Sequence, residues 1–83
     1  MRVSIRYFAS IRETLDRTGE AVETGALTLA GLRDELIDRG GAYAESLARG
    51  RAVRLALNQV MADESALLVE GAEVGFFPPV TGG

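Results

Sequence analysis

Two adjacent prolines, Pro78 and Pro79, determine where secondary structure must stop at the C-terminal end of this chain. Neither ring nitrogen can donate a hydrogen bond, so a strand that runs into them cannot continue in a sheet. Residues 73–77, directly before them, alternate as a strand does and end in two aromatics. The sequence therefore predicts a folded domain over residues 1–77 and a flexible tail over residues 78–83.

The predicted tail is unlike the polar ends at which most domains fray. Its prolines favour an extended base, and Gly82 and Gly83 carry no side chain. Six extended residues span at most about 20 Å, which is enough to reach the active site of a neighbouring protein. We expect the tail to insert into a partner, with the carboxylate of Gly83 as the reacting group. The other residues of the inserted tail would be Pro78, Pro79, Val80, Thr81 and Gly82.

The composition of the 83 residues removes most catalytic chemistries. The chain has no Cys, His, Lys or Trp, and so lacks the commonest general base, the thiol nucleophile, the Schiff-base amine and nearly all zinc ligands. No serine lies in a Gly-x-Ser-x-Gly turn, and no glycine-rich phosphate loop ends in lysine. Asp63 and Glu64 fit a turn better than a metal site, because adjacent carboxylates do not converge on one ion. We expect a carrier, a modifier or a binding module, with no metal and no cofactor of its own.

Charge and hydropathy limit the partners further. Nine arginines against twelve acidic residues give a net charge of −3, which disfavours nucleic acid or a membrane surface as the main partner. No apolar run approaches the roughly 20 residues of a membrane span, and no signal-peptide pattern is present. The absence of cysteine fits a cytoplasmic protein. A small basic cluster, Arg49, Arg51 and Arg54, fits either a solvated loop or a contact with an acidic partner.

The N-terminal part of the chain reads as a strand followed by a short helix. Residues 2–9 alternate between apolar and polar side chains, as in a half-buried strand. Ser10 and Glu13 match a capping box, in which each side chain satisfies the backbone amide of the other residue. The spacing predicts a helix over residues 11–17 that Gly19 ends.

A longer helix follows a weak edge strand at residues 20–24. Thr28 is a favourable N-cap for a helix over residues 29–39, and Gly40-Gly41 supplies a stop. One further helical turn is expected at residues 42–48. The predicted buried stripe of the main helix is Leu29, Leu32, Leu36 and Ile37, and its predicted solvated side is Arg33, Asp34, Asp38 and Arg39.

The remaining segments predict an α+β fold with a mixed sheet of four to five strands, covered on one face by the main helix. A second alternating stretch, residues 52–61, reverses at Asn58-Gln59. If the first and last strands lie side by side and in parallel, Phe8 and Phe77 share the uncovered face near the strand ends. These two aromatics are candidates for docking a partner, and a place at the rim of the core explains them equally well.

Three segments carry a family resemblance: residues 3–13 (VSIRYFASIRE), residues 57–59 (LNQ) and residues 73–83 (EVGFFPPVTGG). They resemble the opening, the hairpin and the C-terminus of the small subunits of molybdopterin synthase. The likeness follows the element order over the full chain and is strongest in the last eleven residues. Gly-Gly alone is weak evidence, but two prolines, a valine and one spacer residue before it make the signal specific.

The resemblance implies a ubiquitin-like β-grasp fold and the role of a sulfur carrier. An adenylyltransferase of the ubiquitin-activating type would use ATP to adenylate Gly83, and a sulfur donor protein would provide the sulfur of the thiocarboxylate. The tail would enter the large subunit of the synthase, with Gly82 beside Gly83 in the tunnel, and give its sulfur to a cyclic pyranopterin precursor. The chain would act as a co-substrate in a heterotetramer of molybdenum cofactor biosynthesis.

Alternatives to this function remain open in the sequence. A sulfur carrier for thiazole or cysteine synthesis would share Gly82-Gly83, and so would a ubiquitin-like protein modifier. A β-grasp module that only binds another protein is a further alternative. The chain departs from the family pattern at Gly31, Ala72 and Gly75. These departures concern local stability or a partner contact rather than the chemistry of the terminus.

Overall fold

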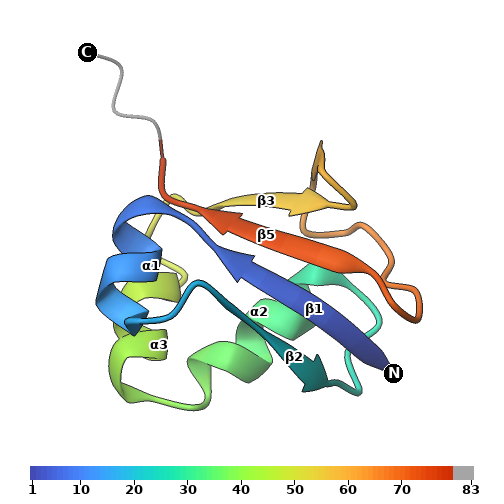
Figure 1. Ribbon diagram of the computed structural model, residues 1–83, viewed down its shortest axis with the longest axis horizontal. Helices are drawn as coiled ribbons and strands as arrows, with labels where there is room; N and C mark the ends of the chain where they lie inside the picture. Colours follow the sequence, from blue (N-terminus) through green and yellow to red (C-terminus); the bar gives the residue numbers. More distant parts are fainter. Residues whose placement is uncertain (80–83) are drawn as a thin grey trace.

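The computed structural model describes residues 1–79, and the tail residues Val80, Thr81, Gly82 and Gly83 lie outside the described part. The described chain forms a five-stranded mixed sheet with three helices (Figure 1). The strands are β1 (Arg2–Tyr7), β2 (Gly19–Glu23), β3 (Arg54–Leu57), β4 (Val60–Ala62) and β5 (Glu73–Phe77). The helices are α1 (Ala9–Leu15), α2 (Leu29–Ile37) and α3 (Gly41–Leu47).

The strand order is β2-β1-β5-β3-β4, so the first and last strands form the centre of the sheet. β1 and β5 are parallel, with Ile5 opposite Val74, and every other pairing is antiparallel. β3 and β4 form a hairpin in which Asn58 and Gln59 both have positive φ, as the tight turn of a twisted hairpin requires. The parallel pairing of the first and last strands, which the sequence argument took as a condition, is present. The edge position of residues 20–24 and the reversal at Asn58-Gln59 are confirmed.

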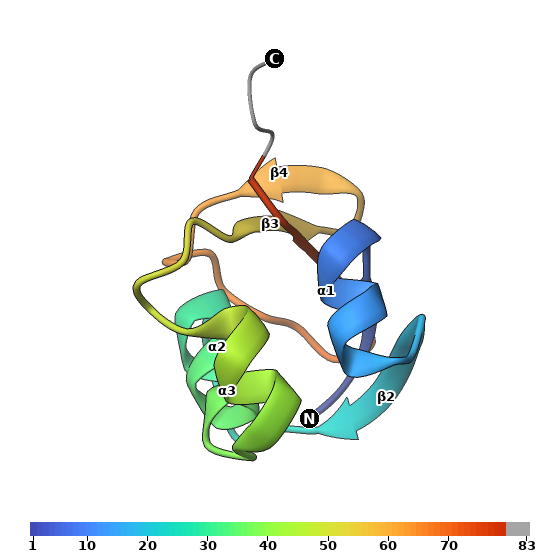
Figure 2. The same cartoon turned by 90° about the vertical axis from the view of Figure 1, so that its left-hand side faces the viewer.

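The helices lie on one face of the sheet, which curves around them (Figure 2). Alternate residues of β1 and β5 point into this layer, together with the apolar stripe of α2, and bury one continuous core. No helix of residues 1–79 lies on the opposite face of the sheet. The largest fully buried side chains of the core are Tyr7, Phe76, Ile5, Leu29, Leu32, Leu36, Leu47, Val3 and Val74.

α1 begins earlier than predicted, and the capping box does not form. The backbone N–H of Phe8 still donates to the carbonyl of Phe76 on β5, at 3.1 Å, which keeps Phe8 extended. The helix therefore starts at Ala9, with Phe8 as N-cap and no side-chain cap, and Ser10 lies inside the first turn. Pairing with β5 decides where α1 begins, and this pairing is not visible in the local sequence.

α1 also ends earlier than predicted, at Asp16 rather than Gly19. Asp16 adopts the left-handed conformation, and its N–H donates to carbonyls of the last turn. Gly19 has a different role at the start of β2. A Cβ at Gly19 would lie 2.4 Å from the carbonyl oxygen of Ile5, so the close approach of β2 to β1 requires a residue without a side chain.

α2 has the predicted cap and buried stripe, but its polar side is not uniformly solvated. The hydroxyl of Thr28 accepts from the N–H of Gly31 at 3.1 Å. Leu29, Leu32 and Leu36 of the predicted stripe are buried, and Ile37 is partly buried against the core. Arg33, predicted on the solvated side, is only 4% exposed, and that prediction is wrong. Its side chain turns towards the end of α3, where backbone carbonyls accept its hydrogen bonds.

The glycine pair after α2 starts the next helix. α2 ends at Ile37, with Asp38 as C-cap, and Gly40 with φ 75° is the N-cap of α3. The further turn expected at residues 42–48 is present as the seven-residue helix α3, which packs against α1 and α2.

Candidate functional site

The base of the predicted tail leaves the sheet at the C-terminal end of a central strand. Pro78 and Pro79, which form the tail base, follow β5 directly. Because β1 runs parallel to β5, the end of β1 and the start of α1 lie at the same end of the sheet as Pro78 (Figure 1). β3 begins there as well, with Arg54 opposite Phe77. Two segments that are far from Pro78 and Pro79 in sequence, the connection from β1 to α1 and the start of β3, therefore lie beside them.

Phe8 and Phe77 meet on the helix-free face, as predicted. Their rings stack face to face, with centroids 4.2 Å apart and planes inclined by 4°. Both side chains are half-buried, which leaves apolar ring surface accessible beside the tail base. Their docking of a partner stays a prediction.

An open, mainly apolar hollow of about 450 Å³ adjoins the stacked rings. Met61, from β4, contributes to this hollow and is 53% exposed. Sequence reasoning did not single out Met61, although it lies opposite Ala56 in the β3–β4 hairpin and therefore shares the open face. The lining residues are Phe8, Ala9, Arg54, Met61, Phe77, Pro78 and Pro79.

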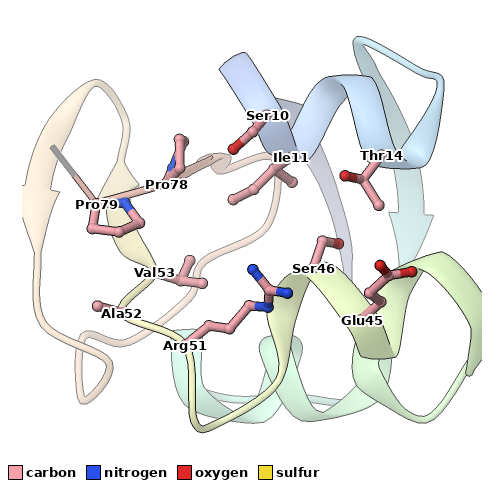
Figure 3. Close-up of a pocket in the computed structure, with 10 residues that line it drawn as sticks. All are labelled: Ser10, Ile11, Thr14, Glu45, Ser46, Arg51, Ala52, Val53, Pro78 and Pro79. Carbon is pink, nitrogen blue, oxygen red and sulfur yellow. The ribbon is translucent and has the colours of Figure 1, made fainter. Parts of the chain in front are cut away.

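A second hollow lies on the helix side of the tail base (Figure 3). This groove of about 340 Å³ is bounded by α1, α3, residues 51–53 and the two prolines. Its apolar side is formed by Ile11, Val53 and Pro79, and Arg51 reaches across it towards α3 (Figure 3). The hydroxyl groups of Ser10, Thr14 and Ser46 and the carboxylate of Glu45 line its polar side (Figure 3). The tail base thus forms a ridge between an apolar and a more polar hollow.

Buried Arg33 fixes the connection that forms one wall of the groove. Its Nε donates to the carbonyl of Leu47 at 2.8 Å, and one terminal nitrogen donates to the carbonyls of Ala48 and Arg51 at 2.7 and 3.1 Å. The other terminal nitrogen pairs with Glu64 at 3.2 Å. One side chain therefore satisfies three carbonyls of residues 47–51, which otherwise form an irregular connection.

Arg49, one of the three arginines of the predicted basic cluster, is engaged within the chain. It forms ion pairs with Asp34 and Glu64 and donates to the carbonyl of Ala30. The carboxylates raise its pKa, the hydrogen bond to Asp34 being the largest cause. Arg51 and Arg54 remain exposed on opposite sides of the tail base.

A polar cluster holds the end of β1 directly before Phe8. The hydroxyls of Tyr7 and Tyr43 donate to the same oxygen of Glu20, at 2.8 and 2.6 Å, and Arg17 and Arg39 pair with the other oxygen. Burial would raise the pKa of Glu20, but the hydrogen bonds from the two tyrosines and Arg39 outweigh it and lower that pKa. Burial, followed by the bond to Glu20, raises the pKa of Tyr7, so this hydroxyl stays protonated.

The described residues include no cluster of metal ligands. Among residues 1–79, no group of three or more His, Cys, Asp or Glu side chains converges on a point. No helix in that part of the chain is both long and apolar enough to cross a membrane. Phe8, Phe77, Pro78 and Pro79 are thus the predicted site residues that the structure brings together, and the reactive Gly83 lies outside the described part.

Comparison with known proteins identifies relatives over nearly the whole chain. The ThiS family matches residues 5–83. The molybdopterin synthase sulfur carrier subunit of Haemophilus influenzae is 31% identical over 81 residues, which cover 98% of this chain and 99% of that protein. The family match includes the whole predicted tail and all but the start of the first strand.

Two solved structures resemble the chain over its full length. SAMP1 from Haloferax volcanii superimposes with a TM-score of 0.79 at 22% identity, covering 100% of both chains. A complex of subunits 1 and 2 of the molybdopterin-converting factor from Helicobacter pylori contains a chain with a TM-score of 0.71 at 27% identity, again covering 100% of both. The predicted α+β fold of ubiquitin-like β-grasp type is confirmed, and the chain belongs to the ThiS family.

Proposed function

We propose that this chain is the sulfur carrier subunit of molybdopterin synthase and that the carboxylate of Gly83 carries the sulfur. The observation that carries the proposal is the full-length match to a chain of the Helicobacter pylori complex of subunits 1 and 2. The name of the Haemophilus influenzae relative points to the same role. The partner under this proposal is the large subunit of the synthase.

The geometry of the tail base supports insertion into such a partner. Pro78 and Pro79 follow a central strand that is fixed on both sides by β1 and β3, so the tail starts from a rigid point. Proline restricts the backbone at this start, which lowers the entropy lost when Val80 to Gly83 are ordered in a tunnel. Phe8 and Phe77, beside the prolines, would rest against the surface around the tunnel mouth.

The chemistry requires activation before sulfur transfer. A carboxylate has no good leaving group, and at neutral pH the terminal carboxyl is ionised. In an adenylyltransferase of the ubiquitin-activating type, an oxygen of Gly83 would attack the α-phosphorus of ATP, and pyrophosphate would leave. The terminal sulfur of a persulfide on a donor protein would then attack the carbonyl carbon, forming the C–S bond as the bond to AMP breaks. A thiol would reduce the S–S bond of the resulting acyl disulfide, which releases the thiocarboxylate and leaves the donor protein joined to that thiol as a disulfide. Because Gly83 and Gly82 have no Cβ, both reagents can approach the carbonyl closely.

The thiocarboxylate is then the sulfur donor in the synthase. Its sulfur would attack the cyclic pyranopterin precursor, and water would cleave the C–S bond to the carrier, returning Gly83 to a carboxylate. The chain itself holds ATP at no step of this scheme, because the activating enzyme uses it. All residues that catalyse the transfer would belong to the partners, which agrees with the absence of His, Cys and Lys from this chain.

Intact mass measurement tests the proposal. After incubation with the activating enzyme, ATP and a sulfur donor, the mass should rise by the exchange of one oxygen for sulfur. Deletion of Gly83 should abolish this change, whereas Leu67→Ala, at an exposed position away from the tail base, should retain it.

The other outcomes distinguish the alternatives. An unchanged mass under all conditions would leave only a binding module, and adducts on lysines of other proteins would indicate a modifier. If the charged chain were isolated with a thiazole or cysteine synthesis enzyme instead of the large subunit, the assignment to molybdopterin synthesis would be wrong.

A further inference from the structure

Gly75 is buried although it lies on the face of the sheet that no helix covers. It is the middle residue of β5, between Arg6 of β1 and Ala56 of β3. Its neighbours along the strand, Val74 and Phe76, point into the core, so Gly75 faces outwards. Side chains on the open face must therefore cover it.

The rings of Phe8 and Phe77 provide this cover. A Cβ at position 75 would lie 3.0 Å from Cε2 and 3.4 Å from Cζ of Phe77, and 3.3 Å from Cε2 of Phe8. Both rings therefore pack against the backbone of Gly75. They also stack on each other, with centroids 4.2 Å apart. The contacts are edges of half-buried aromatic side chains, which can move outwards if a larger residue occupies position 75.

The position of the rings determines the shape of the hollow beside the tail base. Phe77 forms one wall, with Met61, Arg54 and Pro79 among the other lining residues. Arg54 is exposed, and within residues 1–79 its guanidinium forms no ion pair. The hollow shares Pro78 and Pro79 with the tail, so a protein that takes up the tail must also contact this hollow.

We propose that Gly75 is a specificity-determining residue for the large subunit. Because Gly75 has no side chain, the rings of Phe8 and Phe77 can pack directly against the sheet. In this position the rings leave the hollow beside them open. The fitting partner surface carries a protruding apolar side chain that enters the hollow, and a carboxylate that faces Arg54. This inference rests on the proposed function, because it takes the large subunit as the protein that receives the tail.

A size series at position 75 tests the role of Gly75 in the full-length chain. Affinity for the large subunit, measured by calorimetry, should fall about two- to fivefold for Gly75→Ala and at least tenfold for Gly75→Val, because overpacking displaces the rings further as the side chain grows. Ser4→Val is the matched control: it places the same side chain at an exposed position of the same sheet face, opposite Glu73. It should bind as the wild type does.

Two further measurements test the position of the rings, independently of folding, and the charge of the partner surface. NMR ring-proton shifts of Phe8 and Phe77 should change along the series, while methyl shifts of buried Val3 and Leu36 stay constant. Arg54→Glu should weaken binding at least tenfold, because it opposes the partner's carboxylate with a like charge.

Wild-type affinity in Gly75→Val, with its rings displaced, would overturn the inference and leave the proposed function intact. Wild-type affinity and unchanged ring shifts in Gly75→Ala would overturn it even if Gly75→Val failed to fold. Failure of the wild-type chain to bind the large subunit would instead contradict the proposed function.

Discussion

Glu20 receives side-chain contacts from four residues, which tie the edge strand β2 to β1, to α3 and to the connection after α2. Tyr7 of β1, Tyr43 of α3, Arg39 after α2 and Arg17 before β2 all bond its carboxylate. Arg39 also lies over the ring of Tyr43, 4.9 Å from its centroid. A hydrogen-bonded anion at this position fixes Tyr7, and with it the start of the turn that presents Phe8.

The lowered pKa of Glu20 predicts a dependence of stability on pH. The carboxyl group of Glu20 holds its proton less tightly in the folded chain than in the unfolded chain. The stability that Glu20 contributes is therefore complete above its unfolded-state pKa and is lost as pH falls through its folded-state pKa. The free energy of unfolding should decline from about pH 5 downwards, and Glu20→Gln should flatten that decline. Denaturant titrations at several pH values measure it. Glu45→Gln, an exposed carboxylate outside the cluster, is the control, and an equally steep acid decline in Glu20→Gln would contradict the account.

Between elements, Arg33 joins α2 to the connection between α3 and β3. Its guanidinium is the hydrogen-bond donor for three carbonyls of residues 47–51, and it also pairs with Glu64. The wall of the groove beside Pro78 and Pro79 therefore depends on one buried cation.

Arg33→Ala should destabilise the fold by about 3 kcal/mol, because buried carbonyls lose charged donors and nothing replaces them. Arg51→Ala is the matched control: Arg51 gives Arg33 only its backbone carbonyl, and its exposed side chain should change stability by no more than about 0.5 kcal/mol. Urea unfolding of the two variants measures the difference. Equal stability of Arg33→Ala and Arg51→Ala would show that the hydrogen bonds of Arg33 are not needed.

The elements themselves were largely predictable from local patterns. Alternation identified the first and last strands, Thr28 identified the start of α2, and Asn58-Gln59 identified the hairpin. The errors arose where tertiary contacts override local signals. Ser10 matched a cap, but pairing with β5 keeps Phe8 extended and starts α1 two residues earlier, at Ala9. Arg33 occupies a polar position of the helical pattern, and no local signal distinguishes a buried arginine from a solvated one.

At the scale of the whole molecule, the parallel pairing of β1 and β5 at the centre of the sheet determines where the candidate site lies. It brings Phe8 and Phe77, from opposite ends of the chain, together at one end of the sheet beside the tail base. Sequence reasoning placed this pair on one face on the condition that the first and last strands are parallel neighbours, a condition that the structure meets. It missed Met61 and the covering of Gly75, because both depend on side-chain packing across the open face. The tail chemistry of Gly83 stays a prediction.

The most direct test of the sulfur-carrier proposal is a single-turnover reaction. Thiocarboxylated chain is mixed with the large subunit and the cyclic pyranopterin precursor, and the carrier mass and the molybdopterin formed are followed together. The carrier should return to the mass of the carboxylate form as molybdopterin appears, in proportion to the sulfur supplied. A carrier that keeps its sulfur in the presence of both components, with no molybdopterin formed, would contradict the proposal.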